Sequence, residues 1–317
     1  MMIYSRYFNV LELNKNNKII RKSSYDKKLH NEINWYLKIP NDIKKYIPVI
    51  YDYNLNSNNK FIDLKYYSHK TLSDYFLSDL TSELIWNKVF AKLKALLSDF
   101  YFYKVDANAC ELSESLNLMY FNKTMDRLRE FQLQNIIEYN KPLYINETKY
   151  MCVNDYINIL FSLLSEKKIF ECDCFNLIHG DLCFSNILYD ELNNRLIVID
   201  PRGSFGNFSI YGDQRYDLSK IYHSFNGLYD CIKNDSFILD KNKNSISLKI
   251  KKPKHCDAIS ILFKNLLHEF KIDIIQIQLI NILLYLSMLP LHKDNIKHQL
   301  AFLSIGIMNL DELINLK

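Results

Sequence analysis

Glycine and proline are scarce in this sequence, and the first half of the chain has no glycine at all. Each residue type occurs six times in 317 residues, and the first glycine is Gly180. A Gly-x-Gly-x-x-Gly loop, in which the backbone comes close to bound phosphate groups, is therefore excluded before that position. Any phosphate-binding turn in the first half must be built from other residues.

A disulfide framework and a zinc-binding pattern are also missing. The seven cysteines are odd in number and irregularly spaced, and Cys172 and Cys174 have no second Cys or His pair at ligand spacing. No secretory signal opens the chain, because residues 1–10 include Arg6 and lack an apolar core. Free thiols fit a reducing compartment, so we expect a cytoplasmic protein.

Long uninterrupted apolar runs are absent as well. The longest, Ile274–Leu291, is interrupted by polar residues such as Gln278 and Asn281 and contains Pro290 near its end. A membrane span needs about 20 nearly uninterrupted apolar residues, so we predict a buried helix here and no membrane span. The net charge of +4, from 40 basic and 36 acidic residues, gives no reason to expect a nucleic-acid partner. The oligomeric state stays open.

Strand and helix signals alternate in the first 70 residues. Period-two patterns and a polar turn predict two strand pairs, and apolar residues at helical spacing predict one helix between them. The predicted elements are the strands Tyr4–Leu13 and Lys18–Lys22, the helix Lys28–Leu37, and the strands Ile43–Tyr53 and Lys60–Tyr67. This order predicts a small sheet with one helix packed on it.

Helical patterns dominate the rest of the chain. The predicted helices are Thr71–Leu80, Thr81–Tyr103, Ser115–Glu138, Asn154–Lys167, Gln214–Tyr229 and the segment from about Ala258 to the end. Two short predicted strands, Leu188–Tyr189 and Arg195–Asp200, interrupt them. We therefore predict an α+β protein with two lobes and a cleft between them: a small antiparallel-sheet lobe, residues 1–68, and a mostly helical lobe, residues 69–317.

The chemistry is concentrated in Leu177–Leu188, which reads LIHGDLCFSNIL, and in the segment that follows it. Phosphoryl transfer to a hydroxyl needs a carboxylate to orient the nucleophile and hard oxygen ligands for a divalent cation. Asp181 lies on a loop after apolar residues, Asn186 follows five residues later, and Asp200 ends an apolar strand. Turn-forming polar residues are the alternative interpretation, but the order of all three favours a phosphotransferase.

These residues resemble the catalytic loop (His-Gly-Asp…Asn) and the hydrophobic-Asp metal motif of the aminoglycoside phosphotransferase and choline kinase group. That resemblance implies a protein-kinase-like fold, with ATP or GTP as donor and a small-molecule hydroxyl as acceptor. It further implies that Asp181 is the catalytic base, that His179 braces the catalytic loop, and that Asn186 and Asp200 are Mg²⁺ ligands.

Kinase-like sites also place a strand lysine, held by a helix glutamate, on the nucleotide phosphates. Lys22 ends the second predicted strand and Glu32 lies on the following helix, so we predict that they form this pair. Arg21 replaces Lys22 if the register shifts by one residue. A solvated surface pair is the other alternative.

The adenine and phosphates need further contacts. Phe61–Tyr67 resembles the strand that enters the hinge between lobes, which implies that backbone groups near Leu64 and Tyr66 bind the adenine edge. The Asn14–Asn17 turn would cover the phosphates without glycine, because Asn tolerates left-handed backbone and offers its amides.

The segment after Asp200 differs from most aminoglycoside and choline kinases. Its Pro-Arg-Gly sequence resembles kinase-like proteins of bacterial surface-polysaccharide (capsule) gene clusters, and Arg202 could contact phosphate on the acceptor or on the nucleotide. Asp213 and Arg215 are either acceptor contacts or a surface ion pair. Asp217, at the start of a predicted helix (Tyr216–Phe225), resembles the group's structural aspartate, which caps a helix and ties the catalytic loop.

The acceptor itself is not determined by these motifs. Lys123 and Arg127, four residues apart on a predicted helix, either attract an anionic acceptor or form a solvated helix face. No acidic pocket for a polycation is evident. A sugar or polyol of capsule or lipopolysaccharide assembly is the first candidate, followed by choline or ethanolamine and then aminoglycosides. A nucleotide-binding pseudokinase scaffold is the alternative from another class. A protein kinase is disfavoured by the missing Ala-Pro-Glu element.

Overall fold

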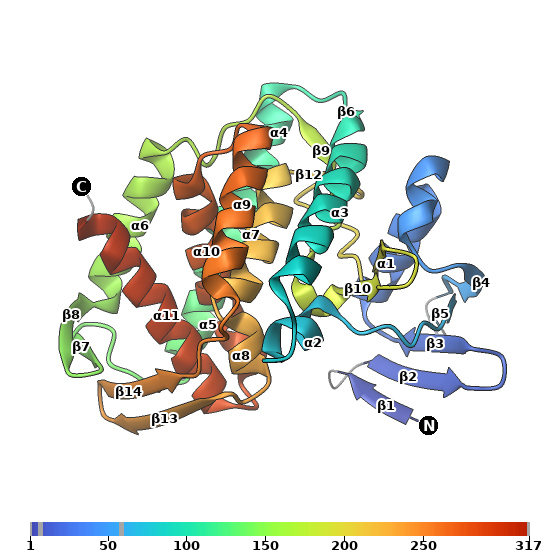
Figure 1. The fold of residues 1–317 in the computed structure, drawn as a ribbon. Helices are drawn as coiled ribbons and strands as arrows, with labels where there is room; N and C mark the ends of the chain where they lie inside the picture. The colour runs from blue at the N-terminus through green and yellow to red at the C-terminus, as the bar shows by residue number, and fades with distance from the viewer. Residues whose placement is uncertain (1, 6–8, 57–59, 316–317) are drawn as a thin grey trace.

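The N-terminal part of the chain forms a twisted antiparallel sheet with one helix packed on it (Figure 1). The computed structural model describes residues 2–5, 9–56 and 60–315. Along the sheet the strands follow the order β1-β2-β3-β5-β4. Their bounds are β1 Met2–Ser5, β2 Asn9–Asn14, β3 Ile19–Ser24, β4 Ile50–Asn54 and β5 Phe61–Lys65.

Helix α1, Lys27–Lys38, lies between β3 and β4 in the chain. Asp26 caps its start, because its carboxylate accepts the backbone N–H of Lys28 at 3.0 Å. The helix ends before Pro40, since the residue preceding a proline avoids the helical region. One face of α1 is buried, including Trp35 and Tyr36. The small sheet with one packed helix that the sequence predicts is therefore present.

Two predicted strands of this part are wrong in detail. Tyr4–Leu13 was expected to be one strand, but β1 and β2 pair with each other, with Tyr4 opposite Val10; residues 6–8 lie outside the described residues. The predicted strand Ile43–Tyr53 begins instead as the 3₁₀ helix η1, Asn41–Tyr46, and only its end belongs to β4. Pro48, whose φ is fixed and which has no N–H, separates the two.

Helices make up most of the remaining chain, as predicted. They are α2 Leu72–Leu77, α3 Glu83–Phe102, α4 Ala109–Leu116, α5 Lys123–Gln132, α6 Val153–Glu166, α7 Gln214–Phe225, α8 Tyr229–Lys233, α9 Cys256–Phe270, α10 Ile274–Met288 and α11 Ile296–Asn315, with the 3₁₀ turn η4 Leu289–His292 before the last. The predicted helix Ser115–Glu138 is composite: α4 and α5 are joined by a π-helical segment, η2, Asn117–Asn122.

Helix α10 is the apolar segment that the sequence singled out. Ile274–His292 is long and apolar enough to cross a membrane by length and composition, but 72% of its 18-residue window is buried inside the protein. Helices α5, α7 and α11 pack around it. A core helix buried on every side is expected to be apolar all round.

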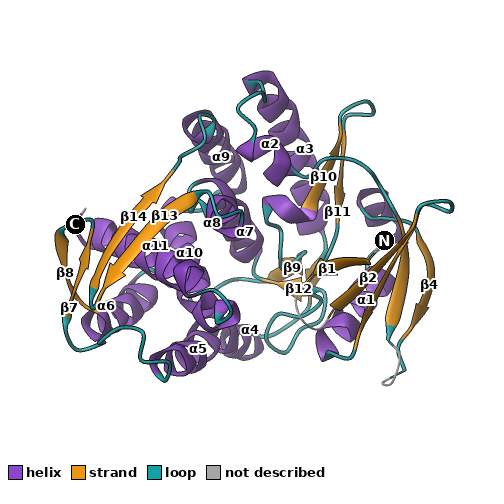
Figure 2. Ribbon diagram, turned by 90° about the horizontal axis from the view of Figure 1, so that it is seen from below, coloured by secondary structure: helices purple, strands orange, loops and turns teal. Residues whose placement is uncertain are grey.

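Three small sheets complete the fold. β10 Ile187–Asp190 and β11 Arg195–Val198 form the predicted hairpin, and β6 Lys104–Val105, β9 Phe175–Leu177 and β12 Tyr211–Gly212 form a second sheet. The third was not predicted; it contains β7 Pro142–Ile145, β8 Thr148–Cys152, β13 Phe237–Asn242 and β14 Ser245–Ile250. It lies at the opposite end of the molecule from β1–β5 (Figure 2). Between β9 and β10 lie residues 178–186, which we call the catalytic loop.

Candidate catalytic site

Asp217 of α7 anchors the start of the catalytic loop. Its fully buried carboxylate accepts the backbone N–H groups of His179 and Gly180, each at 2.7 Å. Burial raises the pKa of Asp217 to about 7, while the two N–H donors act in the opposite direction. The N-cap of α7 is Asp213 and not Asp217. Asp217 therefore ties the loop to a helix, as the resemblance implied, without capping that helix.

Trp35 holds the same loop from the N-terminal part. Its indole Nε1 donates to the carbonyl of Ile178 at 2.7 Å, and its ring meets His179 edge-on with centroids 5.7 Å apart. His179 is 0% exposed, and its Nδ1 accepts the N–H of Asp181 at 3.3 Å. Burial lowers the pKa of His179 to about 4, although Asp181 and Asp200 oppose this shift. The neutral, enclosed ring braces the loop and has no access to a ligand.

Asp181 and Asn186 face each other across the loop. The Nδ2 of Asn186 donates to the backbone carbonyl of Asp181 at 2.9 Å and to its Oδ2 at 3.3 Å. Because the amide nitrogen points to Asp181, the amide oxygen is the atom that Asn186 can offer to a cation. The Asp181 side chain is 38% exposed and also pairs with Lys220 Nζ, 2.9 Å from its Oδ1. The sequence motifs did not assign a role to Lys220.

Lys22 joins the sheet to the segment after β11. Its Nζ lies 2.7 Å from Glu32 Oε2 on α1 and 3.0 Å from Asp200 Oδ1. Burial alone would lower the pKa of Lys22, but the two carboxylates outweigh it and raise that pKa. For Glu32 burial dominates and raises the pKa to about 7. Arg21 points to the other face and pairs with Asp63 through two bonds of 2.7 Å, so the register favours Lys22.

Asp200 is placed for contact with a ligand. Its side chain is 51% exposed, and its backbone has a positive φ of 58°, an uncommon conformation that turns the chain sharply after β11. Asn186 and Asp200 supply an amide and a carboxylate oxygen. Mg²⁺ is usually held by one or two such protein groups together with phosphate oxygens and water. The pair therefore fits Mg²⁺ bound with a nucleotide.

The predicted hinge contacts need one correction. Leu64 is paired within the sheet, opposite Ile20 and Ile50. The backbone N–H of Tyr66 donates to the carbonyl of Lys18 at 2.7 Å, so it is not available to an adenine ring. Among the described residues, the backbone of Tyr67 and Ser68 makes no hydrogen bond. The strand β5 is as predicted, but the available backbone groups lie one or two residues later.

The segment after Asp200 packs tightly on both neighbours. The Arg202 N–H donates to the His179 carbonyl at 2.9 Å. Gly203 has a φ of +69°, and a Cβ there would lie 2.0 Å from the carbonyl oxygen of Asn31 in α1. Only glycine permits this approach. The Pro-Arg-Gly sequence is thus a contact between the catalytic loop and the N-terminal helix.

The predictions for Asp213 and Arg215 are wrong in both forms. The two side chains make a buried ion pair with Nε–Oδ2 at 2.9 Å. The guanidinium also donates to the carbonyls of Lys168, Ile169 and Glu171. A fully engaged, buried pair is neither an acceptor contact nor a surface pair; it fixes the start of α7 against the segment that follows α6.

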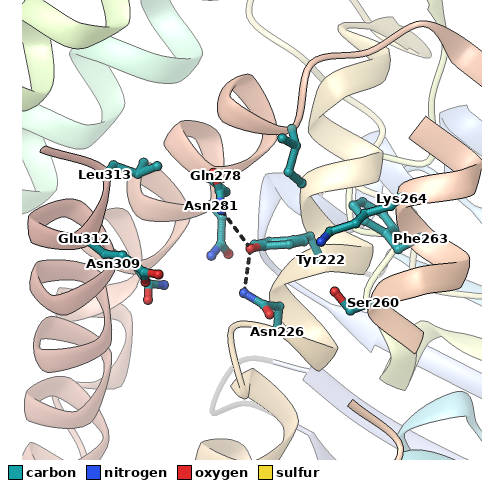
Figure 3. Close-up of a pocket in the computed structure, with 11 residues that line it drawn as sticks. Tyr222, Asn226, Ser260, Phe263, Lys264, Gln278, Asn281, Asn309, Glu312 and Leu313 are labelled. Atoms are coloured by element: carbon teal, nitrogen blue, oxygen red, sulfur yellow. Dashed lines mark hydrogen bonds between the residues drawn. The ribbon is translucent and has the colours of Figure 1, made fainter. Parts of the chain in front are cut away.

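A cavity that is partly open to solvent lies elsewhere in the helical part. Its volume is about 250 Å³, and helices α7, α9, α10 and α11 line it (Figure 3). Tyr222 stands on one wall, where its hydroxyl accepts from Asn226 at 2.6 Å and from Gln278 at 3.4 Å. None of the residues of the catalytic loop lines it. The cavity is therefore separate from Asp181 and Asp200, the predicted catalytic and metal-binding residues.

Comparison with known proteins finds matches among solved structures only. No protein-family model matches the sequence, and no curated protein matches it. Solved structures do. A thermostable mutant of aminoglycoside phosphotransferase APH(4)-Ia has a TM-score of 0.60 at 10% identity, covering 98% of this chain and 94% of that one.

Two further structures give the same result. A streptomycin–ATP complex of APH(2")-IIa has a TM-score of 0.57 at 14% identity, over 98% of this chain and 90% of that one. A GDP complex of an aminoglycoside 2'-phosphotransferase IIIa mutant has 0.61 at 13%, over 98% and 91%. At such identities the likeness concerns the fold alone. The predicted two-lobed, protein-kinase-like α+β fold is thereby confirmed: the chain has the fold of the aminoglycoside phosphotransferases.

Proposed function

We propose that this protein is a small-molecule kinase that transfers the γ-phosphoryl group of ATP to a hydroxyl group. The observation that carries the proposal is the double ion pair of Lys22 with Glu32 and Asp200. It joins a strand, a helix and the post-β11 segment, which are far apart in sequence, beside a loop that carries Asp181 and Asn186. The similar structures include one with AMP-PNP and hygromycin B and one with ATP and streptomycin.

On the donor side, Lys22 contacts the α- and β-phosphates and Glu32 fixes its direction. Asn186 and Asp200 hold Mg²⁺, which when bound neutralises charge on the phosphate oxygens. The Asn-rich turn between β2 and β3 covers the phosphates, and the backbone just after β5 binds the adenine edge. GTP fits the same backbone-mediated scheme, so ATP and GTP are both to be assayed.

On the acceptor side, Asp181 orients the hydroxyl and takes its proton as the oxygen attacks the γ-phosphorus. His179 and Asp217 position the loop that carries Asp181. The acceptor class we put first is a sugar or polyol used in capsule or lipopolysaccharide assembly. This follows from the Pro-Arg-Gly resemblance, and choline, ethanolamine and aminoglycosides are the alternatives.

An acceptor screen read by ADP release tests the proposal. Wild type is assayed with ATP, Mg²⁺ and a panel of sugars, polyols, amino alcohols and aminoglycosides. Asp181→Asn should lower acceptor-dependent turnover about 10²- to 10⁴-fold, the usual contribution of a general base, and leave ATP affinity unchanged. Asp79→Asn, an exposed aspartate paired with Lys251, is the matched control and should keep wild-type turnover. Normal ATP binding without turnover on any acceptor would instead identify a pseudokinase scaffold.

A further inference from the structure

Three cationic side chains gather beside Asp181 from three separate segments. We call Lys123, Lys220 and Arg202 the cationic cluster. Lys220 Nζ lies 2.9 Å from Asp181 Oδ1 and 5.9 Å from the ring centre of Tyr216. Lys123 Nζ lies 5.2 Å from the same ring centre and 3.4 Å from its hydroxyl. The buried ring of Tyr216 is thus shared by two ammonium groups.

Arg202 approaches from the segment after Asp200 and packs against the catalytic loop. Its Cβ is so close to Gly180 that a Cβ on that glycine would lie 2.8 Å away. Gly180 immediately precedes Asp181. The guanidinium makes one hydrogen bond among the described residues, from Nε to the Ser204 carbonyl at 3.0 Å. Most of its five donors are therefore left for another partner.

Lys123 is aimed at this place by an irregular helix. It is the first residue of α5, directly after the π-helical segment η2. Segments with π-helical geometry are uncommon and frequently occur at functional sites. The neighbouring Arg127, four residues on, donates from Nη1 to the carbonyl of Ser287 at 2.6 Å. Lys123 reaches Tyr216, so the expectation of a solvated helix face is wrong for it.

The charges of the cluster are not balanced. Within the ranges that the structure describes, neither Lys123 nor Arg202 forms an ion pair with a carboxylate, and Lys220 has Asp181 alone. Burial and the nearby Arg202, Arg127 and Lys220 hold the pKa of Lys123 well below its usual range, with Asp181 opposing them. The three side chains are partly buried, and a cation without counter-charge in such a place is costly, so a bound anion would favour the protonated form of Lys123. By contrast, the buried Asp213–Arg215 pair nearby is matched in charge.

We propose that the cationic cluster binds an anionic group of the acceptor, a phosphate or a carboxylate, and so selects an anionic sugar or polyol. This inference rests on the proposed function. The acceptor's hydroxyl oxygen forms the new bond to the γ-phosphorus, the bond from that phosphorus to the β–γ bridging oxygen breaks, and the hydroxyl proton passes to Asp181. The anionic group keeps all its atoms and serves only to hold the acceptor beside Asp181.

Binding of inorganic phosphate tests the cluster without turnover. Protein saturated with AMP-PNP and Mg²⁺ is titrated with phosphate in a calorimeter, so that the nucleotide's own phosphate sites are occupied. Lys123→Met and Arg202→Gln should each weaken phosphate binding about tenfold or more, the usual worth of a charge-assisted hydrogen bond. Arg129→Gln removes an exposed cation of the same helix and should change the dissociation constant less than twofold.

A matched acceptor series then tests specificity. Glucose, glucose phosphate and glucosamine differ in charge on one scaffold, as do glycerol and glycerol phosphate. We expect kcat/KM to be highest for the phosphate in each series, and Lys123→Met to lower that value about tenfold while changing the neutral member less than threefold. The KM for ATP should stay within twofold.

Three results would overturn the inference. Phosphate binding that is unaltered in both variants means that the cluster is not the site. Phosphate binding that AMP-PNP abolishes means that the cations serve the nucleotide's γ-phosphate. A preference for glucosamine means that acceptor charge is read elsewhere. If phosphate binds as expected but no acceptor gives Asp181-dependent ADP release, the proposed function fails while the anion site stands.

Discussion

The hydrogen bond from Trp35 to the Ile178 carbonyl is a direct link between α1 and the catalytic loop, and its removal has a predictable cost. Trp35→Phe leaves a buried carbonyl without a donor, because Ile178 is almost fully enclosed. An unsatisfied buried group costs about 1–3 kcal/mol. The smaller ring leaves a void of roughly 40 Å³, which adds roughly 1 kcal/mol. We expect a total loss of about 2–4 kcal/mol.

Trp86 provides a matched control for this substitution. It is also 0% exposed, but its indole N–H has no hydrogen-bond partner among the described residues. Trp86→Phe therefore loses packing contacts but no hydrogen bond. Urea unfolding followed by far-UV circular dichroism should show Trp35→Phe to be less stable than Trp86→Phe by about 1–3 kcal/mol. Equal losses in the two variants would show that the indole hydrogen bond contributes nothing.

The same substitution should affect catalysis. Trp35 packs its ring edge on His179, which in turn accepts the N–H of Asp181. A displacement of about 1 Å at a reacting group can lower the rate about 100-fold. We expect kcat to fall between about 10- and 100-fold, with ATP affinity nearly unchanged. Wild-type kcat in a destabilised variant would limit Trp35 to a packing role.

Three other substitutions test neighbouring features. Gly203→Ala should lower both turnover and melting temperature strongly, because its Cβ would lie 2.0 Å from the carbonyl oxygen of Asn31 and φ is positive; unchanged kinetics would mean that α1 can move away without consequence. Asp217→Asn keeps one of two buried acceptors and should lose about 1.5–3 kcal/mol in urea unfolding, together with kcat. Burial, with Lys220, lowers the pKa of His223 to about 3. Since the folded state favours the neutral ring, stability is fully present above pH 6.5 and is lost toward pH 3, at up to about 1.4 kcal/mol per pH unit. His223→Gln should flatten that acid limb, and an unchanged slope would contradict the assignment.

The reacting side chains could be placed from sequence because their geometry is set locally. Asp181 and Asn186 lie five residues apart on one loop. Asp200 follows a short hairpin whose strands pair in a regular register. Lys22 was assigned to a face by the period of two, and Glu32 by its place on the next helix. The structure brings these two within 2.7 Å of each other. The roles of all five remain proposals.

The four-stranded sheet could not be placed for the opposite reason. Its β14 pairs in parallel with β7, about a hundred residues away, with Ile246 opposite Ile145. No local pattern encodes such a pairing. One signal was nevertheless present: in β14, Ile246 and Leu248 are buried and alternate with exposed residues. That period of two, after a polar turn, would have identified the β13–β14 hairpin.

The burial of charged residues also could not be predicted from the sequence. Arg215 was taken for a surface or acceptor residue, yet its donors end on carbonyls of the segment after α6, some 45 residues earlier in the chain. Sequence spacing does not reveal that kind of contact. The position of Lys220 could have been predicted, because it lies three residues after Asp217 and so shares that residue's face of α7. A residue on that face must meet the catalytic loop, and it pairs with Asp181.

The fold and the acceptor are determined by different parts of the chain. The residues that we assign to the nucleotide lie on β3 and α1 and on either side of the β10–β11 hairpin, and the structures compared, at 10–14% identity, share the fold alone. The cationic cluster instead comes from the start of α5, the end half of α7 and the residue two positions after Asp200. Of the three, Lys220 contacts Asp181 directly, whereas Lys123 and Arg202 lie nearby without a carboxylate partner among the described residues. Likeness of fold therefore leaves the acceptor open, and our proposal for it depends on the charge of these three side chains.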